Sequence, residues 1–109
     1  MGIDYAWEKF HSEIRFALAS TASLQERLGS VISGVCHLQR DNFADEHVWA
    51  KFRKLINETT KREAHNEAEQ TFHTATSHLS DEKAKECLRD AVDIFSDIAI
   101  AYGKTEFSI

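Results

Sequence analysis

The sequence predicts an all-α fold, an antiparallel four-helix bundle in a single domain that comprises residues 1–109. Three observations support this class. The chain has no proline and only four glycines, so few residues interrupt a helix. Apolar residues recur at intervals of three and four along most of the chain, which is the spacing of one buried helical face. Residues able to cap a helix precede three of these segments.

The first two helices are predicted over residues 1–21 and from Ser23 to about Gln39. Asp4 is the expected N-cap of the first helix, and its buried face carries Trp7 and Phe10. The second helix opens with Ser-Leu-Gln-Glu at 23–26, a capping box in which the Ser and Glu side chains bind backbone N–H groups reciprocally. Gly29 and Gly34 within this helix predict a close approach by a neighbouring helix.

The third and fourth helices follow a short turn and an irregular connection. Residues 40–44 are expected to form the turn, and the third helix is expected from about Asp45 to residues 58–60. Residues 61–79 are mostly polar, with a weak stripe of alanines, and predict a loop with a short helical piece near 68–76. The last helix is expected from Ser80 to Tyr102, with Gly103 closing it in the left-handed conformation.

Composition narrows the classes of function. The formal net charge of −5 disfavours general nucleic-acid binding, because neutralising phosphates requires an excess of Lys and Arg. No apolar run approaches the roughly 18 residues of a membrane span, and the N-terminus lacks the basic start and apolar stretch of a secretory signal, so no export is expected. The two cysteines, Cys36 and Cys87, belong to no metal-binding cluster and are expected to be reduced. A cytoplasmic protein without a cofactor is therefore expected.

The leading hypothesis is a module that binds another protein, with a second copy of the chain as one candidate partner. Phe16, Ile94 and Ile100 fall outside the predicted buried stripes and are candidates for an exposed apolar patch. Lys51 and Lys54 share a face of the third helix and are candidates for contact with an acidic partner; Lys54 is also expected to pair with Glu58, four residues on.

An alternative is a ribonuclease. Arg40 and His47 are separated by six residues, which resembles the Arg-x4–6-His spacing of the HEPN ribonucleases, a family of compact helical domains. The resemblance implies that Arg40 and His47 would act on a scissile phosphate across a dimer. The acidic residues Asp41, Asp45 and Glu46 argue against it, because they repel RNA phosphates.

A metal site is the other alternative. If residues 61–79 were one continuous helix, His65, Glu69 and His73 would share one face at intervals of four. The first and the last of these residues would be roughly 12 Å apart along the axis, because an α-helix rises 1.5 Å per residue. All three would therefore need a ligand from another helix to hold one ion.

Three parts of the chain resemble a set of small, uncharacterised, all-helical bacterial proteins. They are the aromatic first helix, Ser-Leu-Gln-Glu-Arg-Leu at 23–28, and Leu-Ser-Asp-Glu-Lys-Ala at 79–84. The resemblance implies a bacterial or mobile-element origin and a shared helical bundle. It implies no activity, cofactor or site residue.

Overall fold

The computed structural model describes residues 2–60 and 76–107, with side chains described as far as Lys104. Within them the chain forms four α-helices and one short 3-10 helix: α1 (Ile3–Ala19), α2 (Leu24–Val35), η1 (Arg40–Asn42), α3 (Glu46–Thr59) and α5 (Asp81–Phe107). No strand occurs in this part of the chain, so the predicted all-α class is confirmed.

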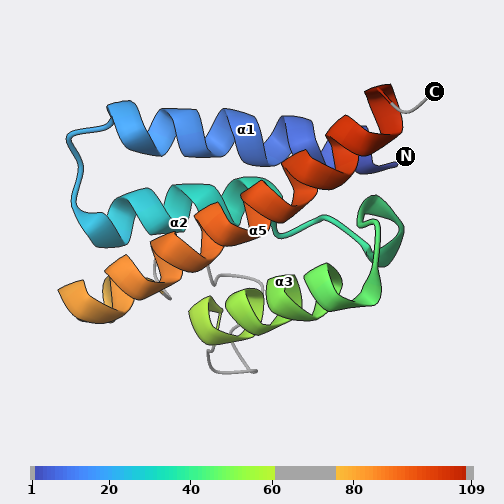
Figure 1. Cartoon of the computed structure of the whole chain (residues 1–109). Helices are drawn as coiled ribbons and strands as arrows, with labels where there is room; N and C mark the ends of the chain where they lie inside the picture. The colour runs from blue at the N-terminus through green and yellow to red at the C-terminus, as the bar shows by residue number, and fades with distance from the viewer. Residues whose placement is uncertain (1, 61–75, 108–109) are drawn as a thin grey trace.

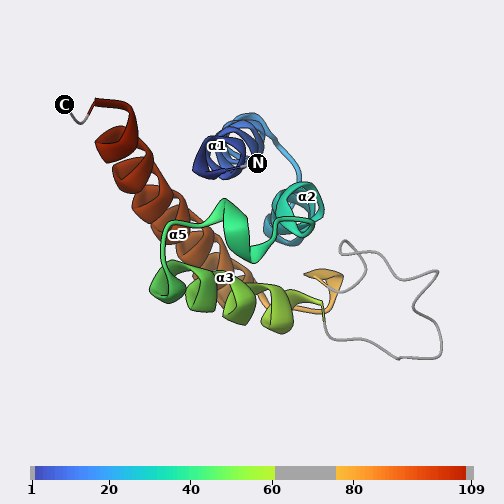
Figure 2. The same ribbon diagram turned by 90° about the vertical axis from the view of Figure 1, so that its right-hand side faces the viewer.

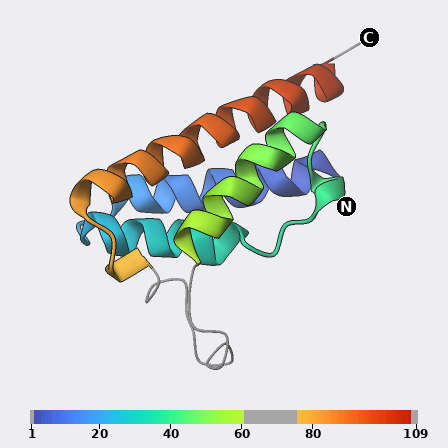
Figure 3. The same ribbon diagram turned by 90° about the horizontal axis from the view of Figure 1, so that it is seen from below.

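The helices pack as an antiparallel bundle around α5. Helix α5 lies against each of the other three helices, and α1 also packs along α2 (Figure 1). In Figure 2, α1 and α2 are seen nearly end-on, whereas α3 and α5 are seen obliquely, so the second pair crosses the first at an angle. From below, α3 runs along α5 in the opposite chain direction (Figure 3). Helix α5 therefore has two flanks, one against α1 and one against α3.

Side-chain caps start the three later helices. The caps at Ser23 and Ser80 are those that the sequence predicts, whereas Asp45 was predicted only as the start of its helix. The Ser23 hydroxyl accepts a hydrogen bond from the Glu26 backbone N–H at 3.1 Å, and the Glu26 carboxylate accepts one from the Ser23 N–H at 3.2 Å. Asp45 caps α3 through a 2.9 Å bond from the Val48 N–H. Ser80 caps α5 through a 3.1 Å bond from the Lys83 N–H.

Three predicted helix ends were wrong. Helix α2 ends at Val35, four residues before the expected end near Gln39. Helix α1 begins at Ile3, so Asp4 lies in its first turn rather than at the N-cap. Helix α5 continues past Gly103 to Phe107, and none of the described residues has positive φ. Glycine permits a left-handed turn without requiring one, and continuing the helix keeps the backbone hydrogen bonds that a turn would end.

The core contains a cluster of aromatic rings that joins α1 to α3. Phe10 and Phe52 are fully buried and meet edge to face with ring centroids 6.1 Å apart. Phe43 belongs to the predicted turn before the third helix; it is buried, and its ring centroid lies 4.9 Å from that of Phe52. The turn residue therefore anchors η1 and the start of α3 to the core.

Helix α1 approaches α2 closely where the sequence has a glycine. A Cβ atom placed on Gly34 would lie 2.2 Å from Cδ of Glu13 on α1, so glycine leaves the space that the Glu13 side chain occupies. The structure thus shows a side chain of α1 packed on Gly34, and a close crossing of the two helices stays a prediction.

The start of α2 holds the chain where it leads into α5. Thr76 is fully buried and its hydroxyl donates a 3.0 Å hydrogen bond to the Gln25 carbonyl. The Gln25 amide donates to the Leu79 carbonyl and to the Asp81 carboxylate, both at 2.9 Å. These bonds fix the first turn of α5 against α2.

Candidate functional site

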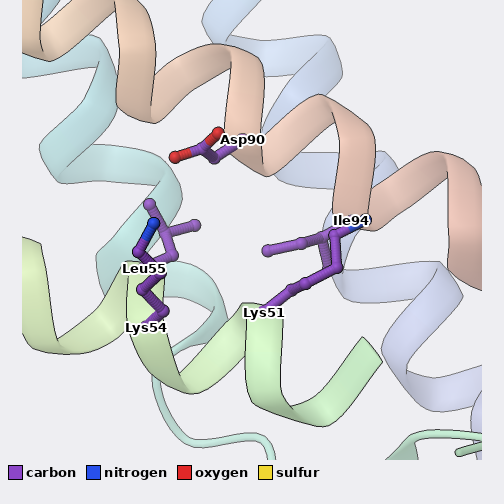
Figure 4. A pocket seen from close by; sticks show the side chains of 5 residues that line it. All are labelled: Lys51, Lys54, Leu55, Asp90 and Ile94. Atoms are coloured by element: carbon purple, nitrogen blue, oxygen red, sulfur yellow. The ribbon is translucent and has the colours of Figure 1, made fainter. Parts of the chain in front are cut away.

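A small hollow of about 180 Å³ opens between α3 and α5 and is lined by Lys51, Lys54, Leu55, Asp90 and Ile94 (Figure 4). Leu55 and Ile94 supply apolar surface, and each is only 1% exposed as a residue. Lys51 and Lys54 come from α3, and Asp90 comes from α5. The hollow therefore combines apolar walls with charged groups of both signs.

Ion pairs join α3 to α5 on both sides of this hollow. At one end Lys51 Nζ lies 2.5 Å from Asp97 Oδ2, with about one third of each side chain exposed. At the other end Lys83 Nζ lies 3.5 Å from Glu58 Oε2. The predicted Lys54–Glu58 pair is therefore replaced by a pair between helices. Such partly exposed pairs contribute about 1 kcal/mol or less each, so they align the helices more than they stabilise them.

The charges form two complementary rows because the helices are antiparallel. Along α3 the row is Lys51, Lys54 and Glu58, positive, positive and negative. Along the same direction in space, the residues on α5 are Asp97, Asp90 and Lys83, which are negative, negative and positive. Each residue of the α5 row therefore has the opposite charge to its neighbour on α3. We call the hollow together with these six charged residues the α3–α5 groove.

Carboxyl groups are crowded at one end of the groove. Burial raises the pKa of the Asp90 carboxyl above its ordinary value, and the negative charges of Glu58 and Glu86 raise it further, against the opposing effect of Lys54. Oε1 of Glu58 is buried and has no hydrogen-bond partner among the described residues. Negative charge at this end is thus only partly compensated, which favours the approach of a positive group.

The Cys87 thiol lies behind the groove on the core side of α5. Burial raises its pKa to about 11, and Glu58 adds to the shift while Lys83 opposes it. A thiol of this kind is protonated at neutral pH and is a poor nucleophile. Both Cys36 and Cys87 are free, as the sequence predicts.

Of the five predicted interaction residues, three line the groove. Lys51, Lys54 and Ile94 surround the same hollow. The expectation that Ile94 is exposed was wrong: packing of α3 against the flank of α5 widens the buried sector of α5 and covers its side chain. Ile100 is 59% exposed and lies one turn beyond Asp97 on α5, so it extends the outer face beside the groove.

Phe16 is also 59% exposed but lies on α1, where it borders a shallow depression with Ser12 and Gly34. The structure therefore separates it from the other predicted interaction residues. Leu18 near the end of α1 is 80% exposed, and Val92 on α5 is 46% exposed. In the last turn of α1 only Ala17 is buried.

The predicted ribonuclease residues lie on η1 and in the first turn of α3, and neither of them lines the hollow. Arg40 donates a 3.1 Å hydrogen bond to the Phe43 carbonyl, and another of its guanidinium nitrogens lies 3.8 Å from a Glu46 carboxylate oxygen. His47 is exposed in the first turn of α3. These contacts give Arg40 a local structural role, and RNA cleavage by this pair stays a prediction.

The metal-binding prediction lies outside the described residues, because His65, Glu69 and His73 all belong to 61–75. In the part of the chain that the structure describes, no group of three His, Cys, Asp or Glu side chains is arranged to hold a metal ion. No helix among the described residues is long and apolar enough to cross a bilayer.

Sequence reasoning missed the α5 side of the groove. Lys83, Asp90 and Asp97 follow one another at intervals of seven residues, two helical turns each, which places them on one face of α5. That spacing is a readable signal of a charged stripe. Its meaning depends on knowing that α3 packs beside it, which the sequence pattern alone does not specify.

Comparison of the chain with protein-family models, with curated proteins and with solved structures found no match. The candidate site is therefore defined by its geometry alone.

Proposed function

We propose that this chain is a protein-interaction module and that the α3–α5 groove is its binding surface. One observation carries the proposal: a small hollow with apolar walls, Leu55 and Ile94, lies between two rows of charged side chains. Interfaces are commonly built from an apolar contact at the centre and a polar rim that fixes orientation.

The size of the hollow supports a protein partner over a small-molecule ligand. Ligand pockets commonly enclose about 300–1,000 Å³, whereas this hollow measures about 180 Å³. It has room for about one side chain of a partner. The acidic row on α5 also disfavours nucleic acid, because phosphates approaching Lys51 and Lys54 would meet Asp90 and Asp97.

Site-specific crosslinking tests the proposal. A photoreactive amino acid at position 54 should form a covalent adduct with a polypeptide in the cells that make this protein. The same group at position 85, an exposed lysine of α5 outside the groove, should form none.

The captured polypeptide is then purified, and its affinity for this protein is measured. Lys54→Glu should lower that affinity at least tenfold relative to the wild-type chain, since a contact at the rim becomes repulsive. Equal crosslinking at positions 54 and 85 would refute the groove as the binding surface.

A further inference from the structure

The signs of the two charged rows specify one partner that carries the matching pattern in the same register: a second copy of this chain. Lys51, Lys54 and Glu58 on α3 are complementary, place by place, to Asp97, Asp90 and Lys83 on α5. The α3 row spans seven residues and the α5 row spans fourteen, and the ion pairs at both ends show that the side chains bridge this difference. This inference rests on the proposed function, because it names the partner of the same groove.

We propose that two copies dock groove to groove about a two-fold axis that runs along the groove. Rotation by 180° about this axis places α3 of one copy over α5 of the other and keeps each residue at the same position along the groove. Lys54 then faces the partner's Asp90, and Lys51 faces the partner's Asp97. The interface is isologous, so every contact occurs twice.

The same arrangement brings compensating charge to the crowded end of the groove. There Asp90, Glu58 and Glu86 lie close enough to raise the pKa of the Asp90 carboxyl. In the dimer the partner's Lys54 approaches Asp90, and the partner's Lys83 approaches Glu58. Lys54 makes no ion pair within 4 Å among the described residues, so its ammonium group is available for this contact.

Ile100 extends the same face beyond the charged rows. It lies one helical turn past Asp97, and the α3 residue one turn before Lys51 is His47, which is exposed. A two-fold axis along the groove sets Ile100 of one copy against the first turns of α3 in the other, where Ala50 is also exposed. Self-association would thereby cover one of the large apolar side chains that the single chain leaves in water.

The proposed contact is small, because α3 has 14 residues and a helix of that length spans about 21 Å. A reversible dimer is therefore expected, of the weak class of interfaces. Sedimentation equilibrium over a concentration series should show a monomer–dimer equilibrium, and its affinity should fall as salt concentration rises, because charge pairs at the rim are screened.

Charge reversal gives the decisive experiment. The dimer contains two symmetric contacts between Lys54 of one copy and Asp90 of the other. Lys54→Glu places two negative charges at each of these contacts, and Asp90→Lys places two positive charges there. Each variant alone should dimerise about a hundredfold more weakly, from roughly tenfold at each of two repulsive contacts. An equimolar mixture of the two variants should restore association, because every facing pair is again of opposite sign. Lys85→Glu and Asp4→Lys, matched charge changes at exposed positions outside the groove, should leave dimerisation unchanged.

The outcomes separate this inference from the proposed function. A wild-type chain that stays monomeric at every concentration overturns self-association, while crosslinking at position 54 still tests the groove with other proteins. A dimer that Lys54→Glu weakens no more than Lys85→Glu overturns the groove as the self-interface. Two folded variants that each lose dimerisation but do not associate when mixed overturn the orientation of the axis. If thermal denaturation shows that Asp90→Lys is unfolded, the comparison of Lys54→Glu with Lys85→Glu still decides whether the groove is the interface.

Discussion

The two flanks of α5 are held by different interactions. On the α1 flank, Trp7 stacks on Tyr102 with centroids 5.3 Å apart and on His11 at 4.6 Å, and the Phe95 ring lies 6.4 Å from Trp7. On the α3 flank, above the buried apolar walls, the outer contacts are ion pairs such as Lys51–Asp97. Aromatic contact is non-directional burial that salt hardly affects, whereas partly exposed ion pairs depend on salt and pH.

This contrast bears on which flank is suited to exchange partners. An ion pair between α3 and α5 can be supplemented by a charged side chain of a second molecule at little cost. Each charged group then has an opposite charge beside it, whether that charge belongs to its own chain or to the partner. Removing an aromatic ring from its neighbours returns apolar area to water and is opposed by the hydrophobic effect. The α1 flank therefore maintains the fold, and the α3 flank is the one available for recognition.

The largest expected effect is on the aromatic flank. Trp7→Ala should lower the free energy of unfolding by about 3 kcal/mol, the lower end of the range for large aromatic residues, because Trp7 is only partly buried. Urea denaturation followed by circular dichroism measures it. Trp7→Phe, which keeps a ring in place, should lose less than half as much. A Trp7→Ala chain as stable as the wild type would show that the stacked rings do not hold α5.

A smaller effect is expected on the charged flank. Asp97→Asn removes the charge that faces Lys51 and should lower the free energy of unfolding by about 1 kcal/mol or less. The difference from the wild type should shrink in molar salt, which screens the pair. Asp93→Asn, a matched change at an exposed position of α5, should not lower the free energy of unfolding, because the Asp93 charge only adds to the negative charge around Asp90. A loss for Asp97→Asn as large as that for Trp7→Ala would abolish the distinction between the flanks.

The smallest effect is expected at Asp90 and has the opposite sign. Its folded-state pKa is raised above 3.8, so the ionised carboxyl destabilises the folded chain at neutral pH. Asp90→Asn should therefore stabilise the chain at pH 7, by less than about 1 kcal/mol, because the group is largely solvated. The advantage should diminish as pH falls through the folded-state pKa of Asp90, and it should vanish below 3.8, where the wild-type carboxyl is protonated in both states. Paired urea titrations from pH 7 to pH 4 measure it. An Asp90→Asn chain less stable than the wild type at pH 7 would contradict the crowding of carboxylates.

Local chemistry made much of the fold predictable. The caps at Ser23, Asp45 and Ser80 act within three or four residues, so the sequence itself contains both partners of each hydrogen bond. Contact with α1 at Gly34 was likewise predictable, because glycine leaves space that a side chain of a neighbouring helix fills, here Glu13. The continuation of α5 past Gly103 was not predictable, because a glycine that permits a turn does not show whether the chain makes one.

The candidate site was predictable only in part. The shared face of Lys51 and Lys54 follows from helical periodicity. The face of α5 that meets α3 depends on packing between segments far apart in the sequence. This packing buries Ile94 and places Asp90 in the wall of the hollow. The replacement of the Lys54–Glu58 pair by Lys83–Glu58 has the same cause, since a charge on a neighbouring helix competes with one on the same helix.

The central position of α5 has a consequence for synthesis on the ribosome, where the chain emerges from its N-terminus. Helices α1 and α2 pack on each other, so this hairpin is able to form as soon as both have left the exit tunnel. Helix α3 has its most extensive contact with α5, so its buried face, including Phe52 and Leu55, lacks that cover until α5 has been made. For that interval a nascent chain exposes apolar surface of the kind that chaperones bind.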